Sequence, residues 1–158
     1  MIEAPDGYRR RAMSSTTLLL IVILVTVAVS MVIAGAIVRG SRARADTALA
    51  GLGTPLRKVA ATSLGRTDDT GESLNGTGTL VLTNEEVGFA QWRPTRILRI
   101  RRSDIVRTDT TREHLGKTMK DDVLRFTWRS DANIEESVAF FVRDLDPWLQ
   151  DLSGSRPS

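Results

Sequence analysis

The sequence predicts one N-terminal transmembrane helix followed by a small, mainly β domain that ends in a short helix. Residues 18–38 form an uncharged, strongly apolar run, and about 20 such residues are enough to cross a bilayer as a helix. From residue 76 onward, β-prone runs recur at a spacing of roughly ten residues, which is typical of a small antiparallel sandwich or barrel. The pair Asp146-Pro147 then favours the start of a helix near the C-terminus.

The N-terminal segments are a polar tail at residues 1–16 and the transmembrane helix at residues 17–38. The helix shows no polar stripe, which a buried helix of a soluble domain would carry. A cleaved signal sequence is the alternative, because Ala34-Gly35-Ala36 has the small-residue pattern of a cleavage site. The apolar run is longer than the ~7–15 residues of an ordinary signal sequence, which favours a retained anchor. Gly35 between two alanines would also let two such helices pair into a homo-oligomer.

The basic residues are concentrated beside the predicted span. Residues 39–66 have a net charge of +5, whereas residues 67–158 have a net charge of −3. This distribution predicts that Arg39, Arg42 and Arg44 anchor the chain on anionic lipid, and it disfavours nucleic-acid binding, which needs positive charge on the fold itself. Five Lys or Arg residues follow the span within about twenty residues and three precede it, so the positive-inside rule places the domain in the cytoplasm, at the cell (inner) membrane.

Few residues of the chain are suited to catalysis or metal binding. There is no cysteine, and the single histidine, His114, is expected to be a solvated loop residue. Gly116-Lys117-Thr118 resembles the end of a phosphate-binding loop, but Thr111 occupies the position of its first glycine. The aspartate pairs at 68–69 and 121–122 lack the alternating oxygen ligands of a calcium loop. We therefore expect no catalytic residue, no metal site, no cofactor and no enzyme activity.

Residues 39–75 are predicted to connect the span to the β domain. The alanine-rich stretch after Arg39 is expected to extend the membrane helix by a few turns, until Gly51 and Gly53 end it. Residues 56–64 then contain a short amphipathic pattern. This pattern is compatible with a surface helix or with the first strand of the domain, because the run is too short for its periodicity to separate the two.

The β domain is predicted at residues 76–152 and is followed by a tail at residues 153–158. A turn at residues 83–86 and a polar loop at residues 114–122 separate its strands. The expected strands are residues 77–82, 87–92, 95–101, 104–111, 123–129 and 137–142. Asp146 can cap a helix whose first residue is Pro147, and a helix this short is expected to dock on the sheet because it is marginal alone.

This succession of elements resembles bacterial pleckstrin-homology-like (PH-like) and GRAM-like domains. The resemblance rests on Leu80-Val81-Leu82-Thr83 followed by residues 86–89, and on the last strand leading to Trp148, and it covers residues 76–152. It implies a strongly bent antiparallel sheet of seven strands, capped at one end by a C-terminal helix. Six strands are clear in the sequence, so a strand at residues 56–64 would complete the set.

Two groups of residues are candidate contacts. Arg96, Arg99 and Arg101 lie in one expected strand and form a candidate site for an anionic headgroup, since the resemblance implies basic residues that grip phosphoinositides in eukaryotic members. Alternating arginines on a solvent face are the ordinary alternative. Trp92 precedes a turn and is a candidate exposed contact for lipid or protein. Trp128 and Trp148 instead fit a core contact between the last strands and the terminal helix.

These features together predict a single-pass membrane protein whose cytoplasmic PH-like domain is a non-catalytic adaptor. Its partners would be the lipid bilayer and an unidentified protein, bound by an exposed strand edge or by loops. The alternative function is a lipid-headgroup sensor that uses the arginine-rich strand. The isolated domain of a sensor would bind anionic vesicles in a salt-sensitive way, whereas the isolated domain of an adaptor would not.

Overall fold

The computed structural model describes residues 15–67 and 74–153. It divides the chain into two compact units, Met1–Ile37 and Val38–Ser158. Most of the predicted tails, at residues 1–16 and 153–158, and the aspartate pair at 68–69 lie outside the described residues.

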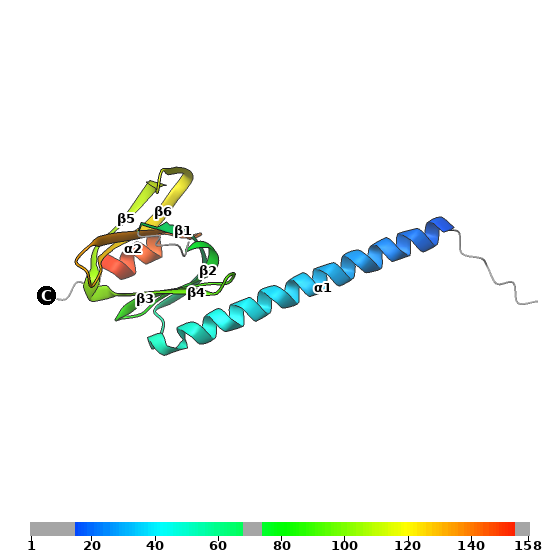
Figure 1. The fold of residues 1–158 in the computed structure, drawn as a ribbon, viewed down its shortest axis with the longest axis horizontal. Helices are drawn as coiled ribbons and strands as arrows, with labels where there is room; N and C mark the ends of the chain where they lie inside the picture. The colour runs from blue at the N-terminus through cyan, green and yellow to red at the C-terminus, as the bar shows by residue number, and fades with distance from the viewer. Residues whose placement is uncertain (1–14, 68–73, 154–158) are drawn as a thin grey trace, which may run out of the picture. The chain divides into compact units, whose positions relative to one another are not determined.

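Helix α1 runs over Ser15–Leu49 and contains the predicted span (Figure 1). Among the described residues, it is the one helix long and apolar enough to cross a membrane. Its large apolar side chains at residues 18–38 are exposed, as lipid-facing side chains would be. The two hydroxyls of this stretch bond to the helix backbone, because Thr26 donates to the Val22 carbonyl at 2.8 Å and Ser30 to the Thr26 carbonyl at 2.8 Å. Neither hydroxyl therefore needs water inside a bilayer.

The second unit is built on one curled antiparallel sheet, which has seven strands within the described residues and the order β4-β3-β2-β1-β7-β6-β5. The strands are β1 (Arg57–Arg66), β2 (Asn75–Leu82), β3 (Glu86–Gln91), β4 (Arg96–Arg101), β5 (Ile105–His114), β6 (Lys117–Arg129) and β7 (Glu135–Phe141). The short helices are η1 (Ala50–Leu52), η2 (Arg102–Asp104) and α2 (Asp146–Ser153). The predicted fold class, a long apolar helix followed by a bent antiparallel sheet and a short C-terminal helix, is confirmed.

The inner face of the curled sheet is apolar because alternate residues of each strand point to it. Its main cluster includes Leu80, Leu82, Val87, Phe89, Leu98, Ile100, Leu124, Phe126, Trp128, Val138 and Phe140. The rings of Phe89 and Phe140 join the two halves of the sheet, with centroids 4.9 Å apart. Helix α2 lies between these halves (Figure 1) and places Trp148, 1% exposed, in the same cluster. The expected core positions of Trp128 and Trp148 are confirmed.

The first strand lies inside the segment predicted as a connector. β1 covers Arg57–Arg66 and pairs with both β2 and β7, so the β domain begins well before residue 76. Of the two interpretations left open for residues 56–64, the strand is correct. Its signal is weak because one of its core-facing positions is Ser63, which is fully buried and donates to the Leu74 carbonyl.

The loop predicted at residues 114–122 is wrong. β5 and β6 form a long hairpin joined at Leu115-Gly116, whose φ angles of 51° and 70° are those of a type I′ turn. The sequence looks like a loop because the hairpin projects from the sheet (Figure 1), and its end therefore carries mostly exposed polar residues on both faces. Such a strand has no apolar alternation to detect.

The expected extension of the membrane helix is confirmed. α1 continues to Leu49, η1 follows, and Gly53 has a φ of 85° that ends the helical segment. The residues after Val38 pack on the outer face of β2 and β3, where Ala45, Leu49 and Leu52 form a second cluster with Val81 and Ala90. Gly88 lies under this contact, since a Cβ there would be 2.2 Å from Leu52 Cδ1.

Candidate interaction surface

A groove lies between β5 and α2. β5 is the last strand in the sheet order, so one of its long sides has no strand beside it in the part of the chain that the structure describes. The groove is open to solvent on one side, has a volume of about 1370 Å³ and is lined by residues of the β2–β3 turn, η2, β5 and α2. This volume exceeds the ~300–1,000 Å³ of a typical small-ligand pocket. The groove is therefore large enough for a segment of polypeptide.

Both walls of the groove present apolar side chains. Leu149 and Leu152 of α2 are half-buried, and Val106 of β5 is 49% exposed. Val106 stands at a register shift between Ile105 and Arg107, which marks a β-bulge. An exposed apolar residue on an edge strand is a favourable place for another chain to pair.

Hydrogen bonds from two arginines fix α2 in place as one wall of the groove. Arg102 donates to the Thr83 carbonyl at 3.2 Å and to the Asp151 carbonyl at 3.3 Å. Arg57 of β1 forms an ion pair with Asp151, with 2.7 Å between Nη2 and Oδ2. These contacts join the end of α2 to β1 and to the β2–β3 turn. These contacts within the domain therefore fix the shape of the groove.

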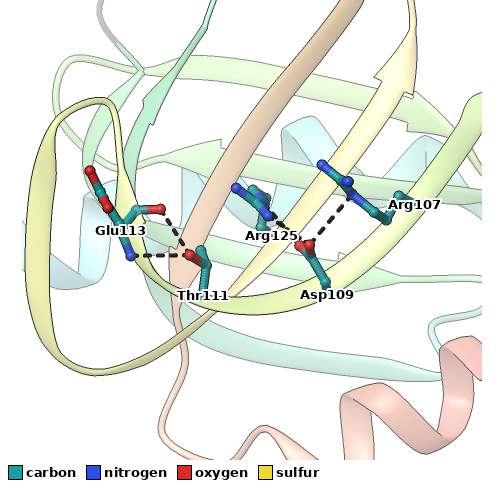
Figure 2. Close-up of polar contacts among 5 residues, drawn as sticks. All are labelled: Arg107, Asp109, Thr111, Glu113 and Arg125. Carbon is teal, nitrogen blue, oxygen red and sulfur yellow. Dashed lines mark hydrogen bonds and ion pairs between the residues drawn. The ribbon is translucent and has the colours of Figure 1, made fainter.

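Charged side chains also order β5 beside the groove (Figure 2). Arg125 of β6 donates to both carboxylate oxygens of Asp109, at 2.9 and 2.6 Å, and Arg107 Nε lies 3.4 Å from Asp109 Oδ2. The Arg125 hydrogen bond lowers the pKa of Asp109, and the same bond raises the pKa of Arg125. Farther along β5, the Thr111 hydroxyl donates to the Glu113 carbonyl and accepts from the Glu113 N–H (Figure 2).

The arginines predicted to bind a headgroup do not form one surface. Arg96 shares its side of β4 with the buried Leu98 and Ile100, whereas Arg99 and Arg101 share the opposite side. Arg99 Nη2 donates to the Ala48 carbonyl at 2.9 Å, at the end of α1. Arg101 Nε lies 4.0 Å from Asp104 Oδ2. Arg99 therefore supports the helix contact on the sheet.

Trp92 lies against α1 and is only partly exposed. Its ring packs beside the outer cluster, and the Arg42 guanidinium carbon lies 4.6 Å from the ring centroid. Its indole Nε1 donates to Thr79 Oγ1 at 3.1 Å. Arg39 and Arg44, the other two arginines predicted to anchor the chain, are exposed on α1. The sequence could not show that residues 42 and 92 meet, because 50 residues separate them.

The expected loop position of His114 is wrong. The side chain is 4% exposed at the end of β5, and its Nε2 lies 2.9 Å from the Gly65 carbonyl oxygen. Gly116-Lys117-Thr118 forms the hairpin turn and the start of β6. Among the described residues, no three His, Asp or Glu side chains gather where they could hold a metal ion. Asp122 instead accepts a hydrogen bond from Arg112 at 2.8 Å.

The groove residues were not among the predicted contacts. Val106 looks like an ordinary member of a β-branched run, and Leu149 and Leu152 look like the docking side of a terminal helix. Only the sheet order makes β5 an edge and places α2 beside it. The exposed Val106 can be recognised as a candidate contact only when the sheet order shows that β5 is an edge strand.

Comparisons with known proteins provide little further information. No family model matches the chain, and no curated protein matches it. One similar solved structure is the crystal structure of the C-terminal domain of an unknown protein from Leishmania infantum. It is 16% identical in sequence, the match covers 75% of this chain and 96% of that chain, and the TM-score is 0.45.

Proposed function

We propose that the chain is a single-pass, membrane-anchored interaction module of the PH-like type. In this proposal its groove between β5 and α2 binds an extended segment of a partner protein. The observation that carries the proposal is the edge strand β5, which runs along a preformed groove with apolar side chains on both walls. The role is non-catalytic, and the domain lies at the inner membrane surface, as the excess of basic residues after the span favours.

Strand addition is the binding mode that suits this groove. The open side of β5 offers main-chain donors and acceptors, and a peptide that pairs there gains hydrogen bonds from its backbone. Because strand side chains alternate in direction, every second side chain of the peptide would face Leu149 and Leu152 of α2. The backbone would provide affinity, and the two leucines would select apolar residues at alternate positions.

The PH-like identity is supported by the sheet and its cap. The resemblance implies a bent antiparallel sheet of seven strands that is closed by a C-terminal helix. Six of these strands are clear in the sequence, and β1 is the seventh. The anchor has a direct consequence for such a module. It restricts the domain to the membrane surface, where a weak peptide contact benefits from a high effective concentration of membrane-bound partners.

Site-specific photo-crosslinking in the full chain tests this function. p-Benzoylphenylalanine at position 106 should give a discrete protein adduct in membranes, and the same adduct should form from position 150 on α2. Ile97 is the matched control, because it is an exposed β-branched residue on the other edge strand and has the same 49% exposure. Position 97 should give no such adduct.

A charge substitution then separates specific binding from proximity. Val106→Glu in the chain labelled at position 150 should reduce the adduct at least about tenfold, since it places an unpaired charge on an apolar contact. Ile97→Glu should leave it unchanged. Equal adducts from both edges, or an adduct insensitive to Val106→Glu, would refute the groove as the binding site.

A further inference from the structure

We propose that Arg39, Arg42 and Arg93 form one binding surface for the headgroups of anionic phospholipids. Arg39 and Arg42 belong to α1, and Arg93 belongs to the connection between β3 and β4. The surface lies within the second unit and is separate from the groove between β5 and α2, so neither depends on the other.

Direct contacts bring the two segments together. Arg93 Nε donates to the Ser41 hydroxyl at 3.3 Å, and the Arg42 guanidinium stacks on the Trp92 ring. Ser41 is buried by this packing. Arg39 precedes Arg42 by three residues and therefore lies on the same side of the helix. Arg42 and Arg93 thus meet where α1 packs on the β3–β4 connection, and Arg39 lies one turn before Arg42 on the helix.

Carboxylates are sparse around this region, and Asp46, which lies one turn after Arg42 on α1, is paired elsewhere. Residues 39–45 and 87–103 contain no Asp or Glu. Arg39, Arg42 and Arg93 are exposed, and none of them pairs with a carboxylate in the described parts of the chain. The nearest acidic residue along the helix, Asp46, pairs with Lys58 at 2.8 Å. Each guanidinium has five N–H donors in a planar fork that suits phosphate oxygens.

The position in the chain identifies the phosphate as that of a lipid. Arg39 directly follows Val38, the last residue of the apolar run. The headgroup layer on each side of a bilayer is ~5–8 Å thick. Arg42 lies about 6 Å along the helix beyond Val38, given a rise of ~1.5 Å per residue. The helix therefore delivers Arg42 to headgroup depth, and the contacts with Ser41 and Trp92 bring Arg93 to the same place.

Lipid retention by the full chain tests this proposal. The protein, purified in a neutral detergent, is titrated with phosphatidylglycerol or phosphatidylcholine, and bound lipid is counted by native mass spectrometry. The wild-type chain should retain phosphatidylglycerol in preference, and added salt should weaken the preference. Arg42→Gln and Arg93→Gln should each lower the apparent affinity for phosphatidylglycerol about fivefold, and the double variant roughly thirtyfold.

Two controls separate a site from net charge. Arg129→Gln with Arg143→Gln removes the same charge elsewhere on the domain and should keep the preference, and Arg42→Lys should keep most of it. Near-ultraviolet circular dichroism confirms that each variant is folded. The proposal is overturned if the double variant keeps the wild-type preference, or if the control pair loses it equally. It is also overturned if free glycerol phosphate binds as tightly as the lipid.

Discussion

Two helical segments pack on opposite faces of the same sheet, and they do so by different means. On the inner face, α2 inserts the large side chain of Trp148 among the core residues. On the outer face, the end of α1 and η1 contribute the smaller apolar side chains of Ala45, Leu49 and Leu52, and they come close to the sheet because β3 has Gly88 there. One contact depends on bulk, and the other depends on the absence of a side chain.

The difference shows how the two contacts respond to change. The core around Trp148 is destabilised when a side chain is shortened, because the close-packed neighbours cannot fill the cavity that the shorter side chain leaves. The contact over Gly88 fails in the opposite way, when a side chain is lengthened, because no space exists between the helix end and the strand. Substitutions of opposite kind should therefore separate the two contacts.

Trp148→Ala should have the largest effect. Removing a buried tryptophan should lower the free energy of unfolding by about 3–5 kcal/mol. Guanidinium unfolding of the full chain in detergent, followed by near-ultraviolet circular dichroism, measures this loss. Trp148→Phe keeps most of the contact and should cost clearly less. A loss below about 1 kcal/mol for the alanine variant would show that α2 does not close the core.

Gly88→Ala should have a smaller effect of the opposite origin. Its Cβ would lie 2.2 Å from Leu52 Cδ1 and 3.0 Å from Leu49 Cδ2, so overpacking should cost about 1–3 kcal/mol in the same unfolding experiment. Leu52→Ala in the Gly88→Ala background should recover part of the loss by removing the clash. Gly40→Ala is the matched control, because no atom lies within 4 Å of the added Cβ. If both glycine variants behave alike, the helix end does not rest on β3.

The same contrast explains what the sequence could predict. Strands with one apolar face, such as the run with Leu124, Phe126 and Trp128, carry a period of two that leads directly to the inner core. The docking of α2 follows from a helix too short to be stable alone. These signals are local, so the fold class and most elements could be predicted.

The outer contact could not be predicted, because its signal is spread over distant positions. Gly88 looks like a weak point in a strand until a helix is known to cross it. From the sequence, Trp92 is expected to be exposed because its partner Arg42 lies at the start of the predicted connector, far from Trp92 in the sequence. The groove beside β5 is hidden for the same reason, since an edge is a property of the sheet order.

The smallest expected effect concerns the β5–β6 hairpin. No helix packs on the outer side of this hairpin in the described residues, and ion pairs stabilise it there. The pKa of Asp109 is lowered by Arg125, so the pair stabilises the fold at pH values above the ordinary aspartate pKa of ~3.9, and this stability is lost as the pH falls through the lowered value. The two side chains are 31% and 25% exposed, so Asp109→Asn should cost only about 0.5–1 kcal/mol at pH 7.

Unfolding measured from pH 7 down to pH 2 checks both parts of this prediction. Asp109→Asn should lose stability at pH 7 and show a flatter decline in acid than the wild-type chain. Asp122→Asn breaks the ion pair between Asp122 and Arg112, whose side chains are 47% and 66% exposed and therefore more exposed than those of Asp109 and Arg125. This substitution should leave the stability unchanged within error, because solvent screens the pair. An acid decline that Asp109→Asn does not alter would mean that the pair with Arg125 adds nothing to the order of β5.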